Sequence, residues 1–206
     1  MTEQIRKTVE ALDRVTTRQI HCGAHTCPPP DRQEIVKVLH ELQALLFPMA
    51  FRREYPNMAD ETLLSQALYR LRDQLAAALR FRMEAGEDAE AAAEGICAAF
   101  AERLPEVKRL LLLDVEALYE GDPAAVSREE VMISYPGFRA ITIFRIAHEL
   151  YLLKAPLIPR IMTEYAHEWT SGKWLCGKNS PATTAAPAAM PDVTHWPAPL
   201  PGARLR

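Results

Sequence analysis

A cluster of histidines and cysteines near the N-terminus is the densest group of possible metal ligands in this 206-residue sequence. His21, Cys22, His25 and Cys27 lie within a stretch of seven residues. Zinc requires ligands that converge as a tetrahedron, and so short a loop can supply only some of them without strain. The spacing also matches none of the usual zinc frameworks. We therefore favour a polar loop ahead of the prolines at 28–30 over a metal site.

An aspartate followed by a proline is the second group that could do chemistry. Asp122 follows Gly121 and precedes Pro123. Glycine commonly ends a helix, and an N-cap carboxylate with a first-turn proline commonly begins one. The sequence therefore predicts that a new helix begins at Asp122. By similar reasoning, Pro136 and Gly137 predict a turn between two later helices.

Two histidines in the C-terminal half invite a catalytic interpretation. His148 has Glu149 beside it, but neighbouring residues on a helix point about 100° apart, so this carboxylate cannot easily orient the ring. We predict a buried, hydrogen-bonded histidine at 148 rather than a catalytic base. At His167 a satisfied or solvent-facing role is favoured over a metal-binding or catalytic one.

Two arginines, Arg139 and Arg145, lie six residues apart and on different faces of the predicted helix. We expect them to pair with acids such as Glu116 or Glu120 rather than to bind an anion. The sequence contains no nucleophile elbow, no phosphate-binding glycine loop and no two-histidine metal motif. An independent active site within this chain is therefore not expected.

Apolar spacing predicts helices along most of the chain, and no run alternates between apolar and polar residues as a strand would. Asp31 and Glu34 form a capping box, and leucines recur every three or four residues between 64 and 79. Pro105 is expected to separate two helices. The predicted helices cover approximately residues 2–20, 31–47, 60–79, 89–103, 105–118, 124–133, 138–153 and 160–167. The expected fold class is all-α.

The character of the sequence changes after His167. All three tryptophans and six of the sixteen prolines lie in residues 168–206, and residues 179–190 are mostly Ser, Pro, Ala and Thr. Such a segment has too few spaced apolar residues to bury a core. We predict a helical domain over residues 1–167 and an irregular Pro/Ala-rich tail over 168–206, either disordered or produced by a frameshift or gene-model error. The alternative is an ordinary disordered tail whose tryptophans dock loosely on the helices.

Charge and hydropathy exclude several classes of function. Lys and Arg number 24 against 27 Asp and Glu, with no basic block, so a nucleic-acid partner is not expected. No apolar run approaches the roughly 20 residues of a membrane span. The N-terminus lacks the apolar core and small-residue cleavage site of a signal peptide. We expect no membrane association and a cytoplasmic location.

One order of motifs is specific enough to suggest a family. The chain resembles the N-terminal helical domain of serine O-acetyltransferase, specifically over about sixty residues and more weakly back to about residue 30. The resemblance stops after His167. The motifs that carry it lie at residues 104–119, 121–125, 135–140 and 145–150.

The resemblance implies an activity whose catalytic half this chain does not show. The family transfers an acetyl group from acetyl-CoA to L-serine in cysteine biosynthesis, with a histidine base and an acetyl-CoA groove on a left-handed β-helix of hexapeptide repeats. No such repeat follows residue 167. The resemblance assigns Asp122 to the binding of substrate serine and implies no catalytic residue, cofactor or acetyl-CoA site within this chain. We therefore expect the chain alone to be inactive and to bind L-serine at best weakly.

The resemblance also implies assembly, because the helical domain joins trimers of the β-helix in this family. The expected partners are further copies of this chain or a full-length paralogue. Cysteine synthase is not expected, because the chain ends in Arg206 rather than in the family's C-terminal isoleucine. The alternative function is a non-catalytic oligomerisation or interaction module that binds through the apolar helix at 138–153. A metal-binding regulator built on the His21–Cys27 cluster is a third and weaker alternative.

Overall fold

The computed structural model describes residues 2–14, 28–82 and 88–171, and every regular element in these ranges is a helix. This confirms the predicted all-α fold. None of the described helices combines the length and apolar character of a membrane span. The elements are α1 (Thr2–Arg14), α2 (Arg32–Leu46), α3 (Pro48–Phe51), the 3₁₀ turn η1 (Arg52–Glu54), α4 (Asp60–Arg82), α5 (Ala89–Gly121), α6 (Arg128–Ser134), α7 (Pro136–Leu152) and α8 (Ile158–Ser171).

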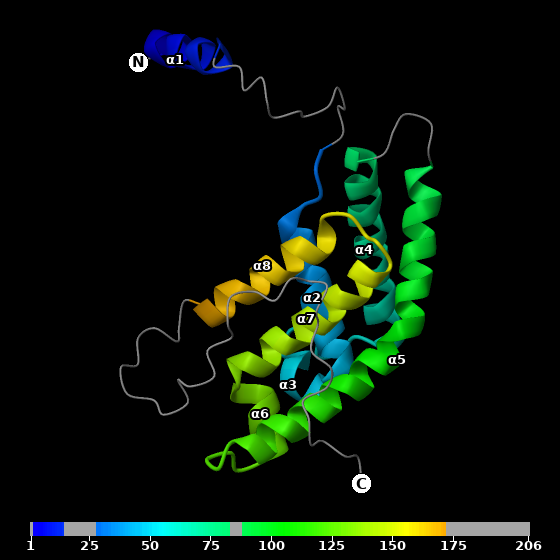
Figure 1. The fold of residues 1–206 in the computed structure, drawn as a ribbon. Helices are drawn as coiled ribbons and strands as arrows, with labels where there is room; N and C mark the ends of the chain where they lie inside the picture. Colours follow the sequence, from blue (N-terminus) through cyan, green and yellow to red (C-terminus); the bar gives the residue numbers. More distant parts are fainter. Residues whose placement is uncertain (1, 15–27, 83–87, 172–206) are drawn as a thin grey trace.

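Five helices enclose the hydrophobic core (Figure 1). α2 packs on α4, α4 on α5, α5 on α7 and α7 on α8, and α8 returns to α2. All five of these helices contribute fully buried side chains, and those from α8 are Ile158, Met162 and Ala166. The largest fully buried side chains are Phe100, Phe138, Ile35, Leu39, Leu42, Leu63, Leu71, Leu75, Leu111, Ile143, Ile146 and Leu150.

The prediction that Pro105 separates two helices is wrong. α5 runs through Pro105 without interruption for 33 residues, and Figure 1 shows its axis changing direction near the middle. Proline removes one backbone hydrogen bond and bends a helix. Phe100 and Leu104 before the proline and Val107 and Leu111 after it are all buried on the core side. Packing on both sides of the bend therefore holds one continuous helix.

The predicted start of α2 at Asp31 is confirmed, but the N–H of Asp31 has a different hydrogen-bond partner from the one that a capping box would supply. Asp31 is the N-cap, and its carboxylate accepts from the Gln33 N–H at 2.7 Å. In a capping box, Glu34 would accept from the Asp31 N–H. Here the side chain of Gln74 on α4 takes that N–H at 2.6 Å, and Glu34 pairs with Arg70 at 2.5 Å. The first turn of α2 is thus joined to α4.

Most of the apolar circumference of α7 is buried. The helix begins at Pro136 with Tyr135 as its N-cap. Gly137 therefore lies inside the helix, so the predicted turn falls one residue earlier than the Pro136–Gly137 pair. α7 ends at Leu152, and a tight connection with positive φ at Lys154 and Leu157 leads to α8.

The two ends of the chain lie partly outside the described residues. The predicted helix over residues 2–20 is described as α1 as far as Arg14, and residues 15–20 lie outside the described ranges. The apolar side chains Ile5, Val9 and Leu12 of α1 are exposed. The His21–Cys27 cluster and residues 172–206 are outside the described ranges. The division into a domain over 1–167 and a tail over 168–206 stays a prediction, and α8 itself continues to Ser171.

Candidate functional site

Asp122 lies in the turn between α5 and α6 and does not begin a helix, contrary to the prediction. Its backbone is extended (φ −114°, ψ 105°), and its carbonyl accepts from the Ala125 N–H at 3.0 Å. Its carboxylate Oδ1 accepts from the Ala124 N–H at 2.9 Å. An aspartate that caps its own turn in this way competes with helix formation. α6 begins instead at Arg128, with Ser127 as its N-cap.

The second carboxylate oxygen of Asp122 has a side-chain partner from further along the chain. The hydroxyl of Tyr135 donates to Oδ2 at 2.5 Å. Tyr135 stands at the junction of α6 and α7, so the contact joins two connections that are thirteen residues apart. Both oxygens of Asp122 are therefore held, one by a backbone N–H and one by a phenol.

These two hydrogen bonds set the charge state of the pair. The pKa of Asp122 lies below its ordinary value, first because Tyr135 donates to the ionised carboxylate and second because Ala124 does. The same bond raises the pKa of Tyr135 to about 12, because a phenolate would face the negative carboxylate. At neutral pH the site therefore holds an ionised Asp122 and a neutral Tyr135.

The nearest arginine in sequence is already paired elsewhere. Arg128 forms a two-pronged ion pair with Glu116, with both nitrogen-to-oxygen distances at 2.5 Å. Its guanidinium also lies over the Tyr119 ring, 4.6 Å from the centroid. Within the described part of the chain, Asp122 forms no ion pair with a cation. Its negative charge is stabilised by neutral donors alone.

Arg145 pairs with an acid, as predicted, but this acid is neither Glu116 nor Glu120. Arg145 on α7 forms a buried, two-pronged pair with Asp114 on α5, at 2.5 and 2.7 Å. The guanidinium of Arg139 lies over the Phe51 ring, 5.7 Å from the centroid. Asp114 was not expected as the partner, because the helix packing that brings it opposite α7 cannot be read from local spacing.

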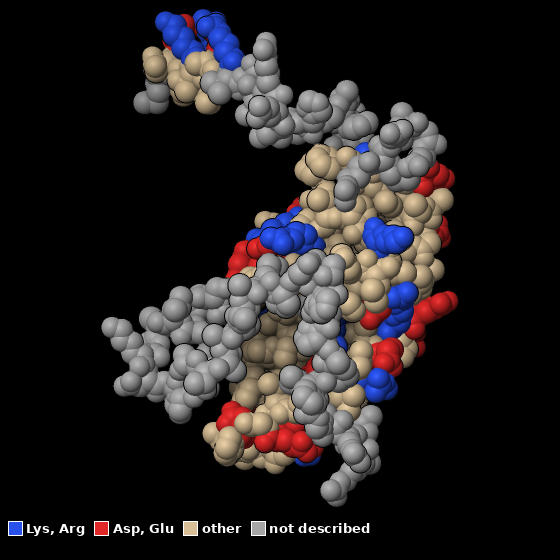
Figure 2. Space-filling model, viewed as in Figure 1, with Lys and Arg blue, Asp and Glu red and all other residues tan. Residues whose placement is uncertain are grey.

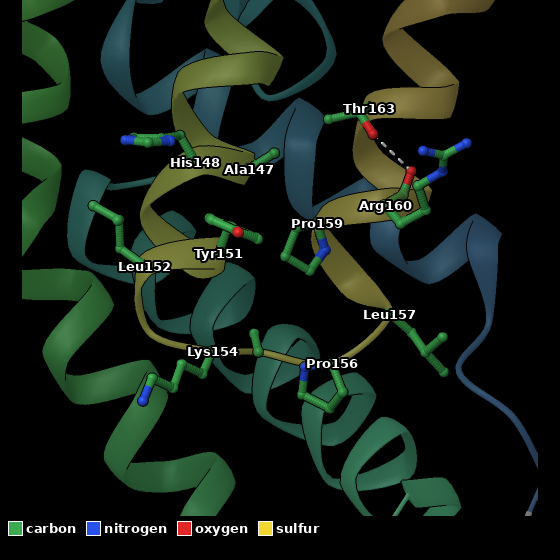
Figure 3. Close-up of a pocket in the computed structure, with 11 residues that line it drawn as sticks. Ala147, His148, Tyr151, Leu152, Lys154, Pro156, Leu157, Pro159, Arg160 and Thr163 are labelled. Atoms are coloured by element: carbon green, nitrogen blue, oxygen red, sulfur yellow. Dashed lines mark hydrogen bonds between the residues drawn. The ribbon is translucent and has the colours of Figure 1, made fainter. Parts of the chain in front are cut away.

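His148 lies at a different place, in a cavity of about 580 Å³ around the connection between α7 and α8. It is partly buried, and burial lowers its pKa first of all. Figure 3 shows the His148 ring and the Arg160 guanidinium on opposite sides of this cavity, while Lys154 points away from both. The Thr163 hydroxyl donates a hydrogen bond to the Arg160 carbonyl at 2.9 Å. Because these groups do not converge on one point, the cavity has no arrangement for acid–base catalysis.

The remaining candidates show no catalytic arrangement. The ring of His167 packs edge-on against Phe144, with centroids 5.8 Å apart. No group of three or more His, Cys, Asp or Glu side chains that could bind a metal occurs in the described ranges, and the His21–Cys27 cluster lies outside them. Tyr135 is the candidate site residue that sequence reasoning missed. The sequence shows that Tyr135 begins the 135–140 motif, but its contact with Asp122 depends on the position of α6 relative to the turn that contains Asp122.

Comparisons with known proteins agree with this fold. Residues 53–143, which include Asp122 and Tyr135, match the family model described as "Serine acetyltransferase, N-terminal". The chain is 39% identical over 157 residues to the plasmid serine acetyltransferase of Synechococcus elongatus, covering 69% of this chain and 49% of that protein. It is 42% identical over 60 residues to the serine acetyltransferase of Synechocystis sp., covering 29% of this chain and 24% of that protein.

Solved structures give the same result. Serine acetyltransferase 1 of Entamoeba histolytica, in complex with L-cysteine, matches with a TM-score of 0.55 and 30% identity over 66% of this chain and 47% of that one. The native form of that enzyme matches with a TM-score of 0.56 and 28% identity over 74% of this chain and 55% of that one. The helical region of this chain, over residues 53–143, therefore matches the N-terminal domain of serine acetyltransferases. The chain spans about half the length of the curated relative from Synechococcus elongatus that it matches over 157 residues.

Proposed function

We propose that this chain is the N-terminal part of a cytoplasmic serine acetyltransferase and that Asp122 binds the ammonium group of L-serine. The reaction would transfer the acetyl group of acetyl-CoA to the serine hydroxyl, giving O-acetyl-L-serine and coenzyme A. Support comes from the family match over residues 53–143, which contains Asp122 and both of its hydrogen-bond donors.

The observation that carries this proposal is that the negative charge of Asp122 is not neutralised by a cation in the described part of the chain. Its carboxylate is ionised, partly exposed and held by neutral donors, while Arg128 is occupied by Glu116. Each carboxylate oxygen can accept more than one hydrogen bond, so acceptor positions remain for a ligand. A primary ammonium group would supply both the missing positive charge and the missing donors.

The surroundings of Asp122 favour a cation as well. Residues 110–138 contain six acidic side chains and a single basic one. Figure 2 shows acidic side chains gathered at the end of the molecule where α5 leads into α6. A cluster of one sign of charge raises the local concentration of oppositely charged groups. The negative field around Asp122 therefore supports recognition of an amino group rather than of a phosphate.

We infer that this chain alone does not complete the reaction. Acetyl transfer to a hydroxyl needs a base and donors for the developing oxyanion. In the described residues His148 and His167 lie on α7 and α8, and no contact links either to Asp122. The base and the acetyl-CoA site are proposed to lie in the half of the relatives that this chain does not match.

L-serine binding by the purified 206-residue chain tests this proposal. We expect saturable NMR shifts of the Ala124 amide on addition of L-serine, with weak affinity, and loss of these shifts in Asp122→Asn. Glu120→Gln is the matched control, because Glu120 is a neighbouring exposed acid with no part in the turn. With acetyl-CoA present, we expect no serine-dependent release of coenzyme A. Release by the pure chain, or equal binding by Asp122→Asn, would contradict the proposal.

A second function, assembly, is favoured by α1. Its stripe of Ile5, Val9 and Leu12 is 57%, 50% and 65% exposed, respectively. α7, in contrast, is largely buried within the domain and exposes mainly Tyr151 and Leu152. We propose that the chain joins other copies or a full-length paralogue through α1. Co-purification with a tagged full-length serine acetyltransferase should be lost in Val9→Asp and kept in Thr8→Asp, and equal recovery of both variants would contradict this.

A further inference from the structure

The phenol of Tyr135 is fixed in place by its backbone. The Tyr135 N–H donates to the Val131 carbonyl at 3.2 Å, which closes α6. Its carbonyl accepts from the Phe138 and Arg139 N–H groups at 3.1 and 3.4 Å, which opens α7. Its ring is partly buried against the hydrophobic core. A residue that ends one helix and begins the next has little freedom to move.

Asp122, in contrast, lies on a short exposed turn. Five residues, from 123 to 127, separate it from the first residue of α6. The carboxylate of an aspartate rotates readily when only one oxygen is held. The Ala124 N–H donates to Oδ1, and this hydrogen bond alone would not fix the position of Oδ2. The hydroxyl of Tyr135, at 2.5 Å from Oδ2, removes that freedom.

We propose that Tyr135 is a positioning residue that fixes the Asp122 carboxylate in the orientation that receives the amino group of the substrate. The inference deepens the proposed function and rests on it. The chemistry divides between the two residues. Asp122 supplies the negative charge and the open acceptor positions, and Tyr135 supplies a neutral donor that orients the carboxylate without cancelling its charge.

A neutral donor suits this role better than a cation would. An arginine or lysine on Oδ2 would also orient the carboxylate, but it would neutralise the charge that an ammonium group needs. The structure places the local cation, Arg128, on Glu116 instead. The phenol therefore allows a rigid carboxylate to remain negatively charged.

The test uses the full 206-residue chain with labelled aspartate and the variants Tyr135→Phe and Tyr119→Phe. Phenylalanine at 135 keeps the ring, the N-cap backbone and the core contact and removes only the hydroxyl. Tyr119 is the matched control, because its ring and not its hydroxyl contacts Arg128. Helical circular dichroism and urea midpoints confirm that both variants fold.

The first readout is the NMR titration of the Asp122 carboxyl. In the wild-type chain and in Tyr119→Phe we expect its pKa below the ordinary aspartate value, and in Tyr135→Phe we expect it to rise toward that value. A residue that only fills space would leave this titration unchanged. An unchanged Asp122 pKa in a folded Tyr135→Phe chain would overturn the proposal.

The second readout is the affinity for L-serine. We expect Tyr135→Phe to bind about threefold to tenfold more weakly, because the carboxylate must then be ordered on binding. Equal affinity with the wild type would also overturn the positioning role. If the wild-type chain shows no serine-dependent shift, the proposed substrate fails, while the Asp122 titration still decides whether Tyr135 holds the carboxylate.

Discussion

Two aspartates, eight residues apart in the sequence, show how the same side chain serves opposite purposes in this domain. Asp114 on α5 is 1% exposed, and both of its oxygens accept from the guanidinium of Arg145. Asp122, just beyond the end of α5, is partly exposed, and its two oxygens accept from a backbone N–H and a phenol. The charge of Asp114 is neutralised by an arginine inside the protein, whereas the charge of Asp122, at the surface, is bound only by neutral donors.

The difference follows from burial. A charge taken out of water must be paired, or it costs several kcal/mol. Asp114 therefore requires a cation, and its pair with Arg145 joins α5 to α7. Asp122 stays partly hydrated, so neutral donors are enough to hold it ionised. An aspartate that folding does not require to be neutralised is available for a ligand.

The largest expected effect comes from removing the charge of the buried aspartate. Asp114→Asn keeps the shape of the side chain but leaves Arg145, itself 9% exposed, without its counter-charge. We expect the free energy of unfolding in urea to fall by about 3–5 kcal/mol. Glu106→Gln is the control, because Glu106 forms an exposed ion pair with Arg109 on the same helix, and it should leave the urea midpoint almost unchanged.

A stability loss below about 1 kcal/mol in Asp114→Asn would contradict the assignment of this pair as a buried interhelical link. If the variant fails to fold, the double substitution Asp114→Leu with Arg145→Met separates the causes. It replaces both charges with apolar groups, and it should recover much of the lost stability.

Much of the helical architecture could be predicted because it follows from local rules. The Asp31 cap depends on residues next to each other in sequence, and it occurs where expected. The leucine spacing along α4 likewise predicts its packing face, and Leu71 and Leu75 are fully buried. These features need no knowledge of the rest of the chain.

The errors occur where distant residues decide the outcome. Pro105 ends a helix by local rules, but buried residues on both sides of it keep α5 continuous. Asp122 begins a helix by local rules, but its carboxylate caps a turn and binds Tyr135. The resemblance suggested Asp122 as a candidate site residue, whereas its hydrogen-bond donor Tyr135 could be found only after α6 had been placed.

A smaller effect is expected on the pKa of Tyr135, the residue that donates to Asp122. The ionised carboxylate of Asp122 raises the pKa of Tyr135 to about 12, so Asp122→Asn should lower that pKa toward the ordinary value of about 10. The tyrosine ¹³Cζ resonance, assigned by its absence in Tyr135→Phe, reports this titration directly. Glu120→Gln removes a nearby charge without touching the bond and should leave the pKa of Tyr135 within a few tenths of the wild-type value.

The sign of the effect on stability also distinguishes the two aspartates. Because the pKa of Tyr135 is higher in the folded than in the unfolded chain, the bond stabilises the fold below about pH 10, and this contribution is lost as the pH rises through about 12. Asp122→Asn should therefore lack this contribution below about pH 10, and its stability should fall less than that of the wild type as the pH rises from about 10 to 12. Asp114→Asn should leave the pKa of Tyr135 where it is. If Tyr135 titrated alike in the wild type and in Asp122→Asn, the phenol would not be bound to an ionised carboxylate, and Asp122 would lose its distinction from any exposed acid.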